Sequence, residues 1–311
     1  MTDKGVTLQT QVRLTAIRLA NGALCDAIER AVSQHRGRQW KLRYAKDMTE
    51  FACHHAAILS DGAYPVFAKL SEAENGREQF EVELAGLRLL ATRAGVLTPT
   101  PIGIVVVDGG SVLILEAVGA VERLSNHWRG IGHALARIHM IKGDRFGLES
   151  HGYWGPLHQD NTPASDWPLF YTERRLWPNL RSAIESGNLP STLIPQVEKL
   201  IVRFPDLCGP TVKPTLLHGD AQQNNFISTE RGAVVIDPAV YYGNPEVDLA
   251  AVGIFQPAPR ELFEGYQEEM HIDSGFRERC GLWRVCGYLA GVSVEGRAYV
   301  EPLSRVLRAY V

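Results

Sequence analysis

Three side chains with oxygen donors, Asp220, Asn225 and Asp237, lie within a short stretch of the chain. Apolar residues lead into a polar loop that contains Asp220, a short strand follows Asn225, and a second strand ends near Asp237. Hard oxygen donors suit Mg²⁺, which proteins hold through one or two side chains together with substrate phosphates. Phosphoryl transfer uses this set: an Asp that orients the attacking hydroxyl, and an Asn and an Asp that hold metal on the phosphates.

The strands beside these donors are predicted to form a β-hairpin, because two apolar-rich runs flank the turn 229–232, which contains Gly. A turn centred between them places Ile227 opposite Val234 and Asn225 beside Asp237. The hairpin then delivers an amide oxygen and a carboxylate to the same end. Each residue alone fits an ordinary capped turn equally well. The whole pattern, His-x-Asp-x4-Asn followed by a strand-terminal Asp, favours the catalytic interpretation.

A lysine and a glutamate upstream are predicted to form a second functional pair. Lys69 lies on the strand 64–70, on the face opposite Val66, and Glu83 projects beside the apolar stripe of the helix 76–94. The stripe is predicted to contain Phe80, Leu84, Leu87 and Ala91. An acid on an apolar face needs a partner, because an unpaired buried charge is costly. A strand Lys paired with a helix Glu holds the α/β-phosphates in kinase-like folds; an isolated Lys69 would instead be a solvated surface residue.

The elements around these residues belong to a chain of ordinary globular composition. Its 311 residues are 45% hydrophobic and 22% charged, with a net charge of −3. This length allows one large two-lobed domain or two modest ones with ample core. The charge balance offers no argument for nucleic acid or an anionic membrane as a partner.

The cysteines and the N-terminus bear on the cellular compartment. Five cysteines, an odd number, are scattered without a Cys-x-x-Cys pair, so neither a zinc site nor a disulfide framework is expected. The first residues lack the basic-then-apolar build of a secretory signal, and no apolar run approaches the length of a membrane span. We therefore expect a cytoplasmic protein with reduced thiols and no membrane contact.

Two motifs carry a family resemblance. The loop from His218-Gly219-Asp220 to Asn225 resembles the catalytic loop of the aminoglycoside phosphotransferases and choline kinases, relatives of the protein kinases. The run 236–250 is similar to the fructosamine (ketosamine) 3-kinases, in which Asp-Pro-Ala, an aromatic pair, Gly and an acidic-x-acidic-Leu-Ala run occur in this order. The strand 66–69 and the helix 80–87 look like that family's strand-lysine motif and acidic helix, and the likeness extends from about residue 64 to 288.

The resemblance implies an α+β, bilobal protein-kinase-like fold. Residues 1–117 would form a small nucleotide-binding lobe with an antiparallel sheet and one key helix. Residues 118–311 would form a larger, mostly α-helical lobe with the catalytic loop and the acceptor site. The implied cofactors are ATP and Mg²⁺, and the implied partner is a small sugar-amine substrate. Neither the acceptor nor the oligomeric state follows from the sequence.

The resemblance also implies a role for each matching residue. Asp220 would orient or deprotonate the acceptor hydroxyl, while Asn225 and Asp237 would hold Mg²⁺. Lys69, fixed by Glu83, would neutralise the α/β-phosphates of ATP.

Supporting roles are implied for three further residues. His218 would organise the loop through hydrogen bonds. Asp248 would brace the loop, or would simply occupy a first helical turn, where an acid suits the helix dipole. Glu116 would mark the connector beside the adenine pocket, or would be a charged strand end at the surface.

Candidates for the acceptor site are Gln222, Tyr241, Tyr242 and Trp154. Amphipathic aromatics stack on sugar faces, although Trp154 and Trp167 fit equally well as anchors of their loop. Fructosamine kinases typically read Leu-Trp-Ser-Gly between the loop Asp and Asn, whereas this chain has Ala-Gln-Gln-Asn, with Gln222 at the Trp position. This departure keeps open an aminoglycoside, other antibiotic or metabolite phosphotransferase.

A second departure precedes Lys69. No glycine lies between Arg38 and Ser60, although close backbone approach to phosphate normally exploits Gly. Lys41, Arg43 or Lys46 would then grip the nucleotide, or would form a solvated basic patch. The missing glycine also motivates a third hypothesis, a catalytically silent pseudokinase that binds a ligand or partner.

Overall fold

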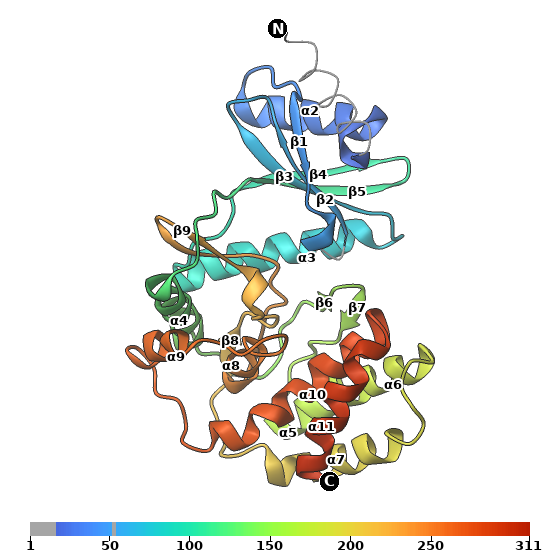
Figure 1. Ribbon diagram of the computed structural model, residues 1–311, viewed down its shortest axis with the longest axis vertical. Coiled ribbons are helices and arrows are strands. Elements are labelled where there is room, and N and C mark those ends of the chain that lie inside the picture. The colour runs from blue at the N-terminus through green and yellow to red at the C-terminus, as the bar shows by residue number, and fades with distance from the viewer. Residues whose placement is uncertain (1–16, 52–53) are drawn as a thin grey trace, which may run out of the picture. The chain divides into compact units, whose positions relative to one another are not determined.

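The structure is a computed structural model that describes residues 17–51 and 54–311 (Figure 1). The chain folds as two units. The first runs to Ala85 and includes Pro99–Ala120; the second contains Gly86–Thr98 and Val121–Val311. The roles expected for 1–117 and 118–311 remain predictions.

The first unit is built on an antiparallel sheet with the strand order β1-β2-β3-β5-β4. Its strands are β1 (Tyr44–Asp47), β2 (His55–Ser60), β3 (Pro65–Ser71), β4 (Pro101–Val107) and β5 (Gly110–Glu116). The predicted strand 64–70 agrees with β3 to within one residue. The short helix η2 (Thr49–Phe51) precedes β2, and residues 52 and 53 lie outside the described ones.

One helix, α2 (Gly22–Arg36), packs on this sheet after a short 3₁₀ turn, η1 (Arg18–Ala20). Ile28 and Val32 are fully buried in the same cluster as Val66 and Ala68 of β3. The helix begins at Gly22, directly after the extended backbone of Asn21.

A second helix, α3 (Gly76–Leu89), carries the predicted apolar stripe over most of its length. Phe80, Leu84 and Leu87 are buried, but Leu90 rather than Ala91 continues the stripe. A π-helical turn, η3 (Leu90–Ala94), begins at this point.

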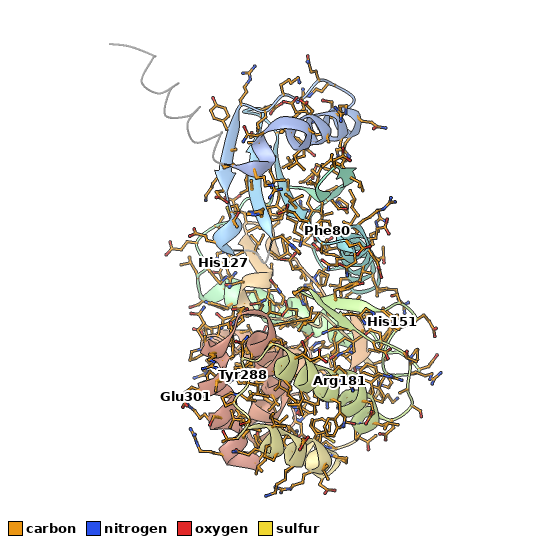
Figure 2. All side chains as sticks on the ribbon, turned by 90° about the vertical axis from the view of Figure 1, so that its right-hand side faces the viewer. Phe80, His127, His151, Arg181, Tyr288 and Glu301 are labelled. Carbon is orange, nitrogen blue, oxygen red and sulfur yellow. The ribbon has the colours of Figure 1, made fainter. Side chains whose placement is uncertain are left out.

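The second unit is mostly helical, as expected for the larger part of the chain. Its α-helices are α4 (Ser125–Met140), α5 (Trp167–Tyr171), α6 (Trp177–Glu185), α7 (Ile194–Leu207), α8 (Glu246–Ala251), α9 (Arg260–Gln267), α10 (Phe276–Val294) and α11 (Val300–Tyr310). A π-helical segment, η4 (Thr172–Leu176), joins α5 to α6, and η6 (Arg297–Tyr299) precedes α11. Figure 2 labels Arg181 on α6 and Tyr288 on α10, two helices that pack together.

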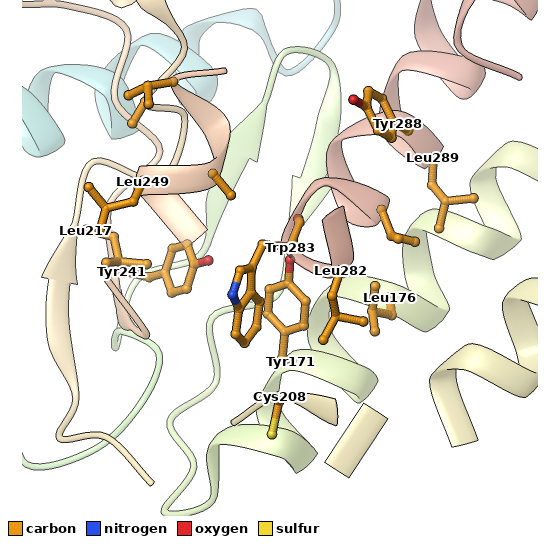
Figure 3. Close-up of a cluster of buried hydrophobic side chains, with 14 of the residues drawn as sticks. Tyr171, Leu176, Cys208, Leu217, Tyr241, Leu249, Leu282, Trp283, Tyr288 and Leu289 are labelled. Carbon is orange, nitrogen blue, oxygen red and sulfur yellow. Dashed lines mark hydrogen bonds between the residues drawn. The ribbon is translucent and has the colours of Figure 1, made fainter. Parts of the chain in front are cut away.

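An aromatic cluster forms the centre of this unit, and Trp283 of α10 contacts three other rings in it. Figure 3 shows Trp283 beside Tyr171. Trp283 lies 5.5 Å from Tyr171 and 5.6 Å from Phe204, between ring centroids, and 6.1 Å from Trp167. Trp167 is only 5% exposed. Of the two roles considered for Trp167, the structure therefore supports the anchor of the loop.

Three two-stranded ribbons in the second unit carry the polar loops. They are β6 (Gly152–Trp154) with β7 (Leu157–Gln159), β8 (Thr215–Leu217) with β11 (Tyr241–Gly243), and β9 (Phe226–Thr229) with β10 (Gly232–Val235). The loop from β8 to β9 contains His218 and Asp220, together with the 3₁₀ turn η5 (Gln223–Asn225). The ribbons therefore hold both ends of the predicted catalytic loop.

Two sequence expectations concern the thiols and the membrane. Among the described cysteines, Cys25, Cys208, Cys280 and Cys286 are free thiols, and Cys53 lies outside the described residues. Burial raises the pKa of the Cys286 thiol to about 11. None of the described helices has both the length and the hydrophobicity that a membrane crossing requires.

Candidate active site

The hairpin β9–β10 has the predicted register, with Ile227 opposite Val234 and Phe226 opposite Val235. One step further, the Ile236 amide donates to the Asn225 carbonyl at 3.0 Å. This bond confirms that Asn225 and Asp237, the residue after Ile236, lie at the same end of the hairpin.

Asp220 accepts hydrogen bonds from amide side chains of its own loop. The Asn225 Nδ2 donates to the Asp220 Oδ2 and to its backbone carbonyl, both at 2.8 Å. The Gln222 Nε2 donates to the same Oδ2 at 3.1 Å. These neutral donors orient the carboxylate, and Asn225 keeps its Oδ1 as the atom with metal-ligand chemistry.

Burial raises the pKa of the Asp220 carboxyl above its ordinary value. The nearby His218 imidazole and hydrogen bonds from Gln222, Trp154 and Asn225 lower this pKa and so oppose the effect of burial. An acid with a raised pKa is a stronger base once it is ionised, which suits proton acceptance from a hydroxyl.

Two backbone positions shape the loop. Gly219 has φ +82°, and a Cβ there would lie 1.9 Å from the Ala239 carbonyl oxygen, so no other residue type fits. Asp237 has φ +48° and is the one described non-glycine residue with positive φ. A left-handed conformation is tolerated by Asp, but it costs energy and is commonest at functional sites.

His218 ties the loop to the segment after β10. The Asp220 amide donates to its Nδ1 at 3.2 Å, so the Nε2 carries the proton that is donated to the Ile236 carbonyl at 3.0 Å. The Ala239 amide in turn donates to the His218 carbonyl at 2.9 Å. The side chain of His218 is fully buried. Its contacts match the organising role that we expected.

Asp248, also fully buried, accepts the backbone amides at the start of the loop. Its Oδ2 lies 2.7 Å from the His218 nitrogen, and its Oδ1 lies 3.0 Å from the Gly219 nitrogen. The His139 Nε2 lies 3.1 Å from Oδ2, and the His139 Nδ1 lies 2.9 Å from the Tyr266 hydroxyl. Asp248 therefore makes the contacts of a brace, and His139 orients it.

Arg123 also holds the loop in place, although it was not among the residues predicted from the sequence. Its guanidinium donates to the Gln223 carbonyl at 3.0 Å, to the Ser228 hydroxyl at 3.1 Å and to the Phe226 carbonyl. Burial lowers the pKa of Arg123. No sequence pattern marked this residue, because its partners are mostly backbone carbonyls distant in the sequence.

A pocket opens beside Asp220 within the second unit, with about 620 Å³ of free space when the part open to solvent is counted. Much of its wall is aromatic, and Figure 3 shows Tyr171, Tyr241 and Trp283 close together there. The polar side chains that line it are Gln159, Arg175, Asn179, Asp220 and Arg284. Arg175 and Arg284 were not anticipated, since an isolated arginine on a helix carries no distinctive pattern.

The acceptor-site candidates separate into two groups. Trp154 and Tyr241 line the pocket. Gln222 contacts the Asp220 carboxylate but does not line the pocket. Tyr242 points the other way: β11 alternates its side chains, and the Tyr242 ring covers Gly143. The geometry therefore does not support Tyr242 as an acceptor-site residue.

In the first unit, Lys69 and Glu83 form the expected ion pair. The Lys69 Nζ lies 2.6 Å from the Glu83 Oε2, and the two side chains are 7% and 13% exposed. The Lys69 ammonium also lies 5.7 Å from the centroid of the Phe80 ring. The pair is therefore positioned by packing as well as by charge.

Two other charged residues of this unit have structural partners. Glu116 accepts the Tyr64 hydroxyl, which lowers the pKa of the carboxyl. Lys41, a candidate for phosphate contact, is paired with Glu29 of α2. The expected place of Glu116 beside the adenine pocket stays a prediction, whereas Lys41 helps to attach α2 through its ion pair with Glu29.

The donor set near Asp220 fits a hard divalent cation. No group of three or more His, Cys, Asp or Glu side chains among the described residues is arranged to hold a metal ion. The set predicted from the sequence is smaller, an Asn225 amide oxygen and the Asp237 carboxylate. Two such ligands suit Mg²⁺, which keeps water and substrate phosphate in its other positions.

Comparison with solved structures places this architecture among the protein-kinase-like folds of the choline kinase and aminoglycoside phosphotransferase type. The choline kinase LicA of Streptococcus pneumoniae has a TM-score of 0.61 at 16% identity, over 92% of this chain and 98% of that one. LicA has also been solved in complex with AMP. The expected fold class, α+β with an antiparallel sheet and a larger helical part, is confirmed.

The family follows from closer matches. The fructosamine kinase family model matches residues 24–311, so the chain belongs to the fructosamine kinase family. The probable ketoamine kinase of Lactiplantibacillus plantarum is 32% identical over 74% of this chain and 81% of its own length. A Thermobifida fusca structure assigned as a fructosamine-3-kinase has a TM-score of 0.78 at 30% identity, over 92% of this chain and 98% of that one.

Proposed function

We propose that this protein transfers the γ-phosphoryl group of ATP to a hydroxyl of an amine-linked sugar. One observation carries the proposal: Asp220 lines a pocket with aromatic walls, while its carboxylate is held by Asn225, the neighbour of Asp237 across the hairpin. Membership of the fructosamine kinase family supports the same substrate class.

Asp220 is the proposed base and orienting group. Its carboxylate receives donors from Asn225 and Gln222, so its remaining acceptor capacity can be directed to the acceptor hydroxyl. Burial raises its pKa and thereby increases its strength as a proton acceptor. Asp248 and His218 fix the backbone on which Asp220 stands.

Asn225 and Asp237 are the proposed Mg²⁺ ligands. The left-handed backbone conformation of Asp237 fixes the point from which its carboxylate extends, next to the end of the hairpin. Bound Mg²⁺ would supply charge neutralisation on the phosphates. Lys69, held by Glu83, would add a fixed positive charge for the α/β-phosphates of ATP. A nucleotide is consistent with the fold, since LicA binds AMP.

The sugar-amine is proposed to occupy the pocket beside Asp220. Trp154 supplies aromatic surface, on which a sugar ring or chain can pack. Tyr241 lines the pocket as well, but its ring is 2% exposed and is covered by Arg175 and Phe170, so it shapes the wall.

The D220N variant tests the proposal. We expect turnover to fall by about 10²–10⁴-fold, because the general base is lost, while the far-UV circular dichroism and Tm stay close to the wild type. Phosphoryl transfer is measured by ³¹P NMR with ketoamines of glycine and lysine made from five- and six-carbon sugars. Near-normal turnover by D220N with every acceptor would refute the assigned role.

An acceptor panel tests the substrate class. Aminoglycosides and amino alcohols are compared with the ketoamines at equal concentration, and phosphorylation of aminoglycosides alone would replace the proposed substrate class. A thermal-shift titration with Mg²⁺-ATP tests nucleotide binding, since a bound ligand raises Tm. Absence of a shift at millimolar Mg²⁺-ATP would favour a catalytically silent protein.

A further inference from the structure

The pocket beside Asp220 contains more positive than negative charge. Among its lining residues, Arg175 and Arg284 are cationic and Asp220 is the one acid. Within the described part of the chain, neither arginine forms an ion pair with a carboxylate. A guanidinium that lines a partly dry pocket without an acidic partner is suited to binding an anionic ligand group.

Arg284 differs from an arginine of the same helix, α10. Arg279 is bonded through its Nε to Glu246 at 2.9 Å and also contacts Asp273, so its charge is neutralised inside the protein. Arg284 donates its Nε to the Ala250 carbonyl at 2.9 Å. The two terminal nitrogens of Arg284 then remain for a ligand, and together they match the two oxygens of a carboxylate.

The backbone near Arg284 makes room for this guanidinium. A Cβ on Gly253 would lie 2.3 Å from the Arg284 Nη2, so the close packing depends on glycine. Phe255, which is close to Gly253 in the sequence and 48% exposed, also lines the pocket. The Ala250 carbonyl and Gly253 thus hold Arg284 in a defined position on the pocket wall.

Two buried polar atoms of the same pocket lack partners among the described residues. They are the Nε of Arg175, a donor, and the Oε1 of Gln159, an acceptor. Arg175 is only 1% exposed, and its guanidinium lies 4.2 Å from the centroid of the Tyr241 ring. An unsatisfied buried polar group is unfavourable, so a ligand with both acceptor and donor groups would be favoured here.

We infer that the pocket contains a carboxylate subsite centred on Arg284. The preferred acceptors are then low-molecular-mass sugar adducts of free amino acids, which retain a carboxylate close to the sugar-bearing nitrogen. A sugar attached to a lysine side chain within a protein lacks that carboxylate. This inference rests on the proposed function and deepens it by naming the substrate subclass.

The first test uses matched acceptors with the wild-type protein. Ketoamines of glycine and of glycinamide, each made from five- and six-carbon sugars, differ in one carboxylate that becomes a neutral amide of similar shape. We expect kcat/KM to be higher for the glycine adduct by about 10-fold or more, because a charge-assisted bidentate contact is lost with the amide. Isothermal titration with the same two adducts provides a binding measurement without turnover.

The second test changes Arg284. R284Q should raise KM for the glycine adduct by about 10-fold or more with kcat nearly unchanged, and should leave the glycinamide adduct almost unaffected. R284K should recover part of the preference through its charge. R277Q is the matched control, because Arg277 lies on the same helix, is exposed and does not line the pocket.

The outcomes separate this inference from the proposed function. Equal kcat/KM values for both adducts in the wild type would overturn the carboxylate subsite and leave the kinase proposal standing. An equal loss for both adducts in a folded R284Q would also overturn it, because a structural role predicts that result. If R284Q does not fold, the R284K variant and the comparison of the glycine and glycinamide adducts in the wild type still test the subsite. No phosphorylation of any ketoamine would overturn the proposed function and the subsite with it.

Discussion

Lys69 and Glu83 in the first unit neutralise each other at 2.6 Å, whereas Asp220 and Asp248 in the second unit are held largely by neutral donors. The donors to Asp248 include two backbone amides, and those to the Asp220 carboxylate are the amide side chains of Asn225 and Gln222. The first arrangement fixes a cation by means of an anion. The second fixes an anion without cancelling its charge, so the carboxylate stays available for chemistry.

The difference has an energetic consequence. Removing one member of a buried ion pair leaves an uncompensated charge. Removing an acid that satisfies backbone amides leaves unsatisfied donors within the loop itself. Replacing Asp220 by Asn, an isosteric amide, leaves no uncompensated charge and few unsatisfied donors, since Asp and Asn can both accept from Asn225 and Gln222.

The largest effect is expected for D248A. The His218 and Gly219 amides and the His139 ring would lose their common acceptor, so we expect unfolding free energy to fall by about 3–5 kcal/mol. Chemical denaturation measures the loss. D166A is the control: Asp166 is exposed and accepts one amide at the start of α5, which predicts a loss of about 1 kcal/mol. Equal losses in the two variants would contradict the brace.

An intermediate effect is expected for K69M. Loss of the cation should lower kcat/KM for ATP by about 10²-fold, because a fixed positive charge on the phosphates disappears. E83Q should have a smaller effect of the same kind, since it releases Lys69 from its position. Initial rates at varied ATP measure both variants.

The control for this pair lies on the same helix as Glu83. Arg77 and Glu81 of α3 form an ion pair at 2.8 Å with side chains 66% and 53% exposed. Surface pairs contribute about 0–1 kcal/mol, so R77Q and E81Q should leave both stability and kinetics nearly unchanged. A kcat/KM for ATP in K69M that equals that of R77Q would remove Lys69 from the proposed nucleotide contacts.

The smallest effect concerns the pH dependence of stability at Asp220. Its folded-state pKa is raised, so its contribution to stability is fully present below the unfolded pKa of about 3.9 and is lost as pH rises through the folded pKa. D220N does not titrate there. The Tm of D220N relative to the wild type should therefore increase from about pH 4 to neutral pH. A difference in Tm that stays constant or falls over this range would contradict the raised pKa.

Local pattern was sufficient for much of the candidate site. The turn 229–232 determined the register that places Asn225 beside Asp237, because a hairpin with a short loop allows few alternatives. The partner of Lys69 could be predicted because a charge on the apolar face of a helix must be compensated nearby. The predicted stripe was wrong only at Ala91, which lies in the π-helical turn η3 beyond the end of α3.

The pocket could not be predicted in the same way. Its wall combines Gln159 of β7, Arg175 of η4, Tyr241 of β11 and Arg284 of α10, which are far apart in the sequence. Tyr241 and Tyr242 are adjacent, yet only Tyr241 lines the pocket, because the strand pairing of β11 decides which face each side chain takes.

The order of residues thus determines which groups can do chemistry, and over a few neighbouring residues it also determines where they point, because turns and strand alternation act at short range. Packing decides the rest. Whether an arginine is neutralised, as Arg279 is, or is left to face a ligand, as we propose for Arg284, depends on which distant carboxylates the folded chain brings within hydrogen-bonding distance. That choice has no signature in local sequence, because a hydrogen bond depends on distance in space rather than along the chain.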